Sequence, residues 1–223
     1  MPGRDVSVHS VQSVHMKIAK WSARQLEKLT EEMRRAYELS QAGNNAEAVK
    51  VYQGALELAR RAGLESGYLL WNLGVVADNA GEVEMAFEYV VRAMALDPLA
   101  QPFQNSFEII VKRIRTALAD DARAVDDPAT PRLYDILTGA GEADALAHVA
   151  MARWCVAGGD LPRAGKLAEA LVTLYPGEPA SWRCKADVAR AAGDGATADE
   201  CMAEAAVRGG TPEPFAVPGV ARG

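Results

Sequence analysis

The feature that most constrains the fold of this chain is a recurring spacing of small residues. At four glycines that lie far apart in the chain, an alanine follows five residues later and another small residue stands seven residues earlier. A spacing that recurs with a period of roughly 20 to 50 residues predicts a repeat architecture. The glycine and alanine pairs are Gly43/Ala48, Gly81/Ala86, Gly159/Ala164 and Gly193/Ala198, and the preceding small residues are Ala36, Gly74, Ala152 and Ala186.

The geometry of a helical hairpin accounts for these residue types. A glycine ends the first helix because it adopts the left-handed conformation at little cost. The small residues before and after it allow two antiparallel helices to approach closely. Proline then ends the second helix at Asp97-Pro98 and Tyr175-Pro176, since it cannot continue a helix. Each repeat is therefore predicted to be a pair of antiparallel helices.

The composition agrees with an all-α chain and excludes several function classes. Aromatic residues make up only 6% of the sequence, and runs of strand-favouring residues are scarce after the first twenty positions. The formal net charge is −6, which disfavours binding to a phosphate backbone, so we expect no nucleic-acid partner. No segment has the roughly 18 consecutive apolar residues that span a bilayer. We therefore expect no membrane insertion, no secretion and a cytoplasmic location.

Two stretches carry a resemblance to a known family. The residues Trp71-Asn72-Leu73-Gly74, followed by Gly81, Ala86, Ala93 and Pro98, resemble a tetratricopeptide repeat with most of its consensus positions occupied. A second, partial match has Trp182, Gly193, Ala198 and Ala205. Ala164 and Ala198 are 34 residues apart, which is the period of that family. The resemblance implies an all-α solenoid of helix-turn-helix repeats, with about four recognisable repeats and one irregular helix pair.

The repeat pattern divides the chain into five segments. The steps from Ala48 to Ala86 and from Ala86 to Ala164 exceed 34 residues, and we assign the first excess to the loop at 63–66. The second excess predicts an irregular pair, with a long helix over 104–122 and a short one over 132–138. The predicted segments are an N-terminal arm and capping helix (1–28), two repeats (29–100), the irregular pair (101–144), two repeats (145–212) and a disordered tail (213–223).

Both terminal repeats depart from the family pattern. Glu32 and Arg35 occupy positions at which the family prefers large apolar residues, and Lys185 is equivalent to Leu73. A polar outer face is expected there because no neighbouring repeat covers it. We further predict a helix over 16–29 as a cap for the first repeat, because apolar residues recur there with a loose helical period.

The resemblance implies a partner-binding groove lined by the first helix of each pair. In the N-terminal half, large apolar and amide side chains are expected to contact a partner, or else to pack between repeats. In the C-terminal half, arginines are expected to receive an acidic or phosphorylated segment, or else to form a solvated face with an Arg183/Asp187 ion pair. The predicted partner-binding residues are Met33, Tyr37, Tyr68, Trp71, Asn72, Val75, Asn79, Arg153, Arg183 and Arg190.

No catalytic, cofactor or metal site is predicted. His9, His15 and His148 are too scattered for a metal centre, and the motifs of nucleotide binding, zinc proteases and serine hydrolases do not occur. The chain has three cysteines without metal-like spacing, which indicates reduced thiols. Cys155 is expected to face the interior of its hairpin as a small apolar residue.

The sequence therefore predicts a non-enzymatic adaptor or scaffold that binds a protein or peptide segment in its groove. Two alternatives stay open. The chain could be a small acidic chaperone for a secreted or assembly-prone client, since an apolar groove and an acidic balance fit that role equally well. It could also be a self-assembling scaffold, with the N-terminal arm forming a homodimer.

Overall fold

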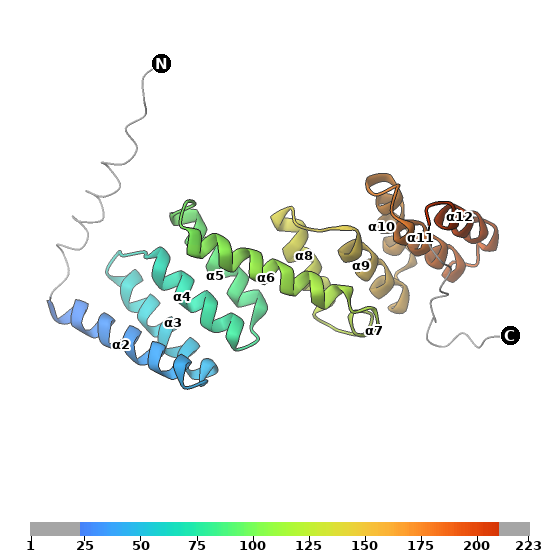
Figure 1. Ribbon diagram of the computed structural model, residues 1–223. Helices are drawn as coiled ribbons and strands as arrows, with labels where there is room; N and C mark the ends of the chain where they lie inside the picture. Colours follow the sequence, from blue (N-terminus) through green and yellow to red (C-terminus); the bar gives the residue numbers. More distant parts are fainter. Residues whose placement is uncertain (1–22, 210–223) are drawn as a thin grey trace, which may run out of the picture. The chain divides into compact units, whose positions relative to one another are not determined.

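In the computed structural model, residues 23–209 are described, apart from the side chains of residues 121 and 122 (Figure 1). Within 23–209 the secondary structure is helical, and it forms two compact units, residues 23–110 and 111–209. The helices are α2 (Ala23–Gln41), α3 (Asn45–Arg61), α4 (Gly67–Asn79), α5 (Val83–Leu96), α6 (Gln101–Ala119), α7 (Asp121–Ala124), α8 (Thr130–Ala140), α9 (Ala145–Ala157), α10 (Leu161–Leu174), α11 (Pro179–Ala191) and α12 (Gly195–Val207).

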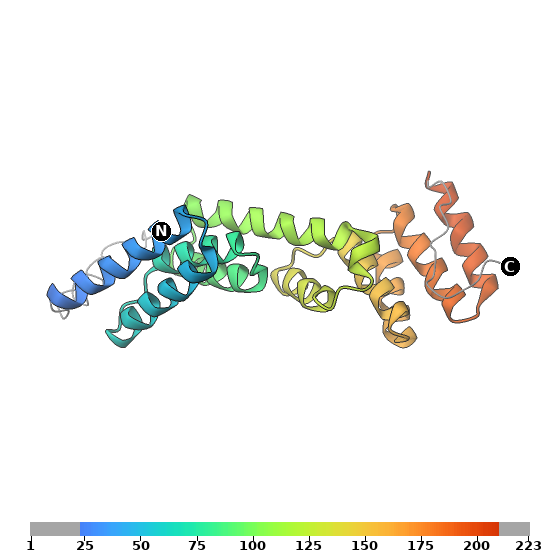
Figure 2. The same ribbon diagram turned by 90° about the horizontal axis from the view of Figure 1, so that it is seen from below.

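The glycines that end the first helices have the predicted conformation. Gly43, Gly81, Gly159 and Gly193 have φ angles of 80°, 82°, 77° and 81°, which is the left-handed region that a side chain disfavours. Each lies in the short turn of a hairpin: α2/α3, α4/α5, α9/α10 and α11/α12. The last hairpin is clearest at the C-terminal end of the described chain, where α11 and α12 lie side by side (Figures 1 and 2).

Close helix approach explains why Gly74 is small. A Cβ atom at this position would lie 2.7 Å from Cγ2 of Val90 and 3.2 Å from the carbonyl oxygen of Ala86. Ala36, Ala152 and Ala186, at the equivalent positions, are fully buried. The predicted close packing of the two helices in each hairpin is therefore confirmed.

The extra residues of the first repeat lie mainly in a helix. The α3 helix has 17 residues, whereas α5 and α10 have 14 each. The assignment of the whole excess to the loop at 63–66 was therefore wrong. No proline interrupts residues 45–61, and the second helix is nearly one turn longer than its counterparts.

Two other boundaries differ from expectation. The α2 helix passes through residue 29 without a break, so the predicted helix is confirmed over 23–29 and is continuous with the first helix of the first repeat. Positions 16–22, the N-terminal arm and the tail after 209 lie outside the described residues. The α6 helix begins at Gln101, directly after the Asp97-Pro98 turn, and the short α7 was not predicted. The α8 helix is longer than expected, from Thr130 to Ala140.

The polar residues of the terminal repeats differ in their surroundings. Arg35 is exposed and Glu32 half-buried, as expected of an outer face. The side chain of Lys185 is only 22% exposed and forms an ion pair with Glu169 of α10, with 2.9 Å between Nζ and Oε1. Lys185 therefore faces the preceding hairpin, and its charge is balanced there by Glu169 rather than by water.

Candidate functional site

In unit 1, the first helices display aromatic side chains that are partly used for packing. Tyr68 and Trp71 of α4 lie against Phe103 of α6, with ring centroids 5.1 and 6.0 Å from that of Phe103. The indole Nε1 of Trp71 donates a hydrogen bond to Oγ of Ser106 at 2.9 Å. Phe103 is almost completely buried, whereas Trp71 is half-buried. Trp71 thus serves inter-repeat packing, with part of its surface left accessible.

Three large apolar side chains are exposed on the first helices α2, α4 and α6. Tyr37 of α2 is 57% exposed, Tyr68 of α4 is 56% exposed, and Ile109 of α6 is 51% exposed. Tyr37 and Ile109 occupy the register position of Val75, the residue that follows Gly74 in α4. Exposed aromatic and aliphatic groups gathered on one face are typical of protein interaction surfaces.

The remaining predicted residues of this unit are less open. Met33, Asn72 and Val75 are half-buried, and Asn79 is exposed at the end of α4. The main-chain oxygen of Asn79 accepts a hydrogen bond from Nδ2 of Asn45 at 3.3 Å. We define the apolar face of unit 1 as Met33, Tyr37, Tyr68, Trp71, Asn72, Val75, Asn79 and Ile109.

Sequence reasoning missed the contribution of α6 to this face. Extending the 34-residue period from Tyr68, Trp71 and Val75 leads to Pro102, Asn105 and Ile109, all of which are exposed. The period was a sufficient signal, but the irregular second half of this repeat concealed it. Phe103, whose ring contacts Tyr68 and Trp71, was missed for the same reason.

In unit 2, arginines surround a buried carboxylate on the first helices α9 and α11. Asp187 is 8% exposed. Its Oδ1 lies 3.2 Å from Nη1 of Arg190, and its Oδ2 lies 4.0 Å from Nη2 of Arg153. Arg153 is largely buried, whereas Arg190 is exposed. The geometry unites two predicted arginines around Asp187, and we define Arg153, Arg183, Asp187 and Arg190 as the arginine face.

Burial and charge act on Asp187 in opposite directions. Burial raises the pKa of its carboxyl above the ordinary value, and the charges of Arg153, Arg190 and Arg183 partly offset this increase. The charge of Arg183 therefore also acts on Asp187. Asp187 is a buried acid that contacts arginines from two helices, rather than part of a solvated face.

Two neighbouring apolar residues of α9 differ in exposure. Val149 occupies the register position of Trp71 but is buried, where it packs with Ala152, Leu171 and Cys184. Leu146, one turn earlier on α9, is 50% exposed. The two positions differ because the side chain of Val149 points into the α9/α10/α11 contact.

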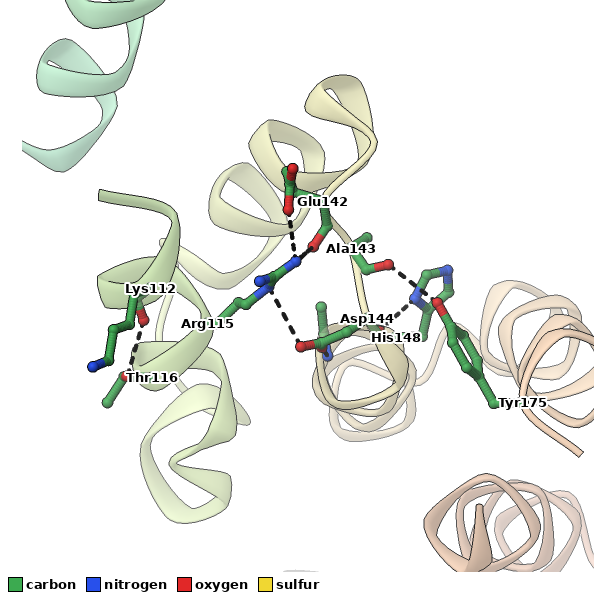
Figure 3. Close-up of polar contacts among 9 residues, drawn as sticks. Lys112, Arg115, Thr116, Glu142, Ala143, Asp144, His148 and Tyr175 are labelled. Carbon is green, nitrogen blue, oxygen red and sulfur yellow. Dashed lines mark hydrogen bonds and ion pairs between the residues drawn. The ribbon is translucent and has the colours of Figure 1, made fainter. Parts of the chain in front are cut away.

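A polar junction in unit 2 connects three helices through one loop (Figure 3). Arg115 of α6 donates to the main-chain oxygen of Glu142 at 2.7 Å, and Oη of Tyr175 donates to that of Ala143 at 3.1 Å. Nδ1 of His148 lies 2.8 Å from the main-chain oxygen of Asp144 and donates to it. Three consecutive carbonyls are thus satisfied by side chains from different elements.

The other contacts of this polar junction also have a structural role. The side chain of Arg115 also contacts the carboxylates of Glu142, at 2.8 Å, and Asp144, at 3.5 Å. The His148 ring packs edge-on against Tyr134 and Tyr175. These interactions satisfy the polar groups of the loop and hold the start of α9.

The thiols and potential metal ligands give no chemical site in the part of the chain that the structure describes. Cys155, Cys184 and Cys201 are buried and unbonded to one another. Burial raises the pKa of the Cys155 and Cys201 thiols, which disfavours the reactive thiolate. Across residues 23–209, no three potential ligands cluster around a metal position, and no helix has the length and apolarity needed to cross a membrane.

The hairpins therefore have the tetratricopeptide-repeat fold, as the 34-residue spacing, the left-handed glycines and the close contact at Gly74 indicate. No family model and no curated protein matches the chain.

Several solved structures are similar to it. The TPR2AB-domain:pHSP90-complex of yeast Sti1 has 17% identity and a TM-score of 0.39, covering 81% of this chain and 77% of that one. MamA 41-end from Desulfovibrio magneticus RS-1 has 17% identity and a TM-score of 0.36, with coverages of 81% and 94%. YrrB, described as a TPR protein with an unusual peptide-binding site, has 15% identity and a TM-score of 0.36, with coverages of 80% and 84%.

Proposed function

We propose that this protein is a non-enzymatic interaction adaptor that binds a segment of another protein on the apolar face of unit 1. The observation that carries the proposal is the exposure of Tyr37, Tyr68 and Ile109 on three successive first helices. Large side chains of this kind supply most of the binding energy at protein interfaces. Exposure of their apolar surface to water is unfavourable, so a partner that covers these side chains lowers the free energy.

The polar groups beside these residues suit a peptide backbone. Asn72 and Asn79 lie on the same helix as Tyr68, and exposed Asn105 lies on α6. Amide side chains both donate and accept hydrogen bonds, so they can pair with the main chain of an extended segment. Apolar anchors with interspersed amides therefore favour a peptide over a small molecule.

The decisive experiment selects peptides from a random displayed library with the full chain and measures their dissociation constants. The test variant is Tyr37→Ala with Ile109→Ala, because both side chains are more than half exposed, at 57% and 51%. Tyr68 and Trp71 are unsuitable because both also pack on the buried ring of Phe103. The matched control is Leu99→Ser with Val207→Ser, which removes two exposed apolar side chains, 88% and 83% exposed, outside the face.

We expect the test variant to weaken binding by about tenfold or more, since an anchor residue contributes roughly 2 kcal/mol. The control should bind within about twofold of the original chain. Circular dichroism should show equal helicity in all three proteins. Equal affinity of the test variant and the control would refute the proposal.

A further inference from the structure

We propose that the outer face of α3 is a homodimer interface, at which two copies of the chain pair their α3 helices in antiparallel orientation around Gly54. The outer face of α3 consists of Glu47, Lys50, Val51, Gly54, Glu57, Leu58 and Arg61. It shares no residue with the apolar face of unit 1. The proposal goes beyond the adaptor function because it assigns a second copy of this chain as the partner of a different surface.

The shape of this surface suits a second helix. A hollow of about 390 Å³ lies between α2 and α3, lined by Lys28 and Glu32 of α2 and by all of the outer face except Glu47. Val51 and Leu58 are half-buried there, on either side of the exposed Gly54. Among the described residues outside its own helix backbone, no atom lies within 4 Å of the place that a Cβ atom of Gly54 would occupy. Another helix can therefore approach α3 closely at this glycine.

The charged residues of the outer face alternate in sign along the helix. They are Glu47, Lys50, Glu57 and Arg61, separated by three, seven and four residues, which keeps them on one side of a helix. Gly54 lies midway between the first and the last. Reversing the order exchanges acids and bases, so an antiparallel copy centred on Gly54 places Arg61 opposite Glu47 and Glu57 opposite Lys50. A parallel copy would place like charges together.

The existing partners of these groups can be exchanged easily. Arg61 pairs with Glu57 at 3.0 Å, and Arg35 lies 3.9 Å from Glu47. All four side chains are more than half exposed. Exposed ion pairs contribute little to the stability of a single chain, so their replacement by pairs between two copies costs little.

The charge balance also favours self-association at this face. Residues 23–110 contain 8 basic and 13 acidic residues, a net charge of −5. The outer face of α3, with Lys28 and Glu32, has three bases and three acids. Two acidic molecules repel each other, and the repulsion is weakest where each presents a neutral surface.

The size of the face predicts a weak dimer. The α3 helix has 17 residues, which corresponds to a length of about 25 Å at about 1.5 Å per residue. Two helices paired over this length form an interface at the lower end of the specific range, about 1,200 Å² or less. We therefore expect a dissociation constant on the order of micromolar.

The first test is sedimentation equilibrium of the full chain, from low micromolar to near-millimolar concentration. The test variant is Gly54→Gln, which places a long neutral side chain at the point of closest approach. The matched control is Gly165→Gln in α10, because Gly165 is also a helical glycine whose Cβ position meets nothing within 4 Å. Both substitutions improve helix propensity, so neither should lower the melting temperature of the monomer, measured below the dissociation constant.

We expect the original chain and the control to dimerise within about twofold of each other, and Gly54→Gln to weaken the dimer by about tenfold or more. A chain that stays monomeric at every concentration would overturn the proposal. So would equal dimerisation of Gly54→Gln and Gly165→Gln, which would show that association does not involve α3.

The second test separates antiparallel pairing from a general effect of net charge. Glu57→Lys makes the chain less acidic, so reduced repulsion alone predicts a tighter dimer. Antiparallel pairing predicts weakening by about threefold or more, because two lysines then face each other at both ends. The double variant Lys50→Glu with Glu57→Lys should restore the original affinity. A tighter dimer of Glu57→Lys, or no restoration by the double variant, would exclude this orientation.

The dimer and the adaptor function are tested independently. The Tyr37→Ala/Ile109→Ala variant should dimerise like the original chain, because neither residue belongs to the outer face of α3. The Gly54→Gln variant should bind the selected peptides with unchanged affinity. Loss of dimerisation in the first variant would contradict the assignment of the interface to α3.

Discussion

The first helices of units 1 and 2 share one packing rule but display opposite chemistry. A small residue, Gly74 in α4 and Ala152 in α9, lies at the contact with the second helix of the hairpin. The next residue is Val75 in unit 1 and Arg153 in unit 2. Since neighbouring helical residues point about 100° apart, one contacts the second helix of its hairpin while the other points away from that helix. Fold and surface chemistry are therefore encoded at adjacent positions.

The two units also differ in how successive repeats are joined. In unit 1, Trp71 and Tyr68 pack against Phe103 in an aromatic cluster. In unit 2, side chains of Arg115 and Tyr175 donate to loop carbonyls. Ring packing gives its energy through buried area and tolerates small shifts, whereas hydrogen bonds need defined distances. The first junction suits an adaptable apolar face, and the second fixes charged groups precisely.

Removal of the central ring of unit 1 should have the largest effect. Phe103→Ala deletes an almost fully buried side chain, so we expect unit 1 to lose about 3–5 kcal/mol of stability. Hydrogen exchange, read helix by helix, should show the loss in α4 and α5. Phe103→Leu serves as the control and should cost about one third as much. Similar effects of the two substitutions would show that the ring contacts contribute little.

A pair of glycine substitutions compares the two units directly. Gly74→Ala places a Cβ atom 2.7 Å from Val90 and should destabilise unit 1 by about 1–3 kcal/mol. Gly165→Ala in α10 meets nothing within 4 Å and should stabilise unit 2 by about 0.5–1 kcal/mol. Thermal unfolding of each variant checks the opposite signs. Equal signs would contradict the close approach at Gly74.

The polar junction of unit 2 should make an intermediate contribution. Arg115→Met keeps most of the apolar stem but removes the bonds to Glu142, and we expect a loss of about 1–3 kcal/mol. Tyr175→Phe removes only the bond to Ala143 and should cost about 1 kcal/mol. Exchange of the amides at the start of α9 is the sensitive readout. Unchanged exchange there would exclude a positioning role for the loop.

The pH dependence of Asp187 should be the smallest measurable effect. Its pKa is raised in the folded chain, so the folded state binds more protons than the unfolded state above about pH 4. Asp187 therefore favours folding least at neutral pH, and stability falls as pH rises from about 4 through the raised pKa. Asp187→Asn should flatten this part of the curve of unfolding free energy against pH. An unchanged curve would show that the carboxyl titrates normally.

Part of the candidate site was readable from the sequence. The spacing from each hairpin glycine correctly placed Tyr37, Tyr68 and Arg190 at exposed positions of first helices. The same spacing puts Val149 in register with Trp71, but it does not say how far a neighbouring helix covers a given position, and Val149 is buried. The 34-residue period continues from α4 into α6 and leads to Ile109. Ile109 was missed because the irregular helices that follow α6 concealed this period.

The sequence by itself determined the hairpins, their turns and the helix faces, because glycine conformation, proline and small-residue spacing act locally and with a fixed period. Only the tertiary structure decided which outward residues are used in packing and which are free. Trp71 is joined to Ser106 across 35 residues, and Asp187 is buried against an arginine 34 residues away. Burial and pairing of this kind depend on contacts between helices, which no local pattern records.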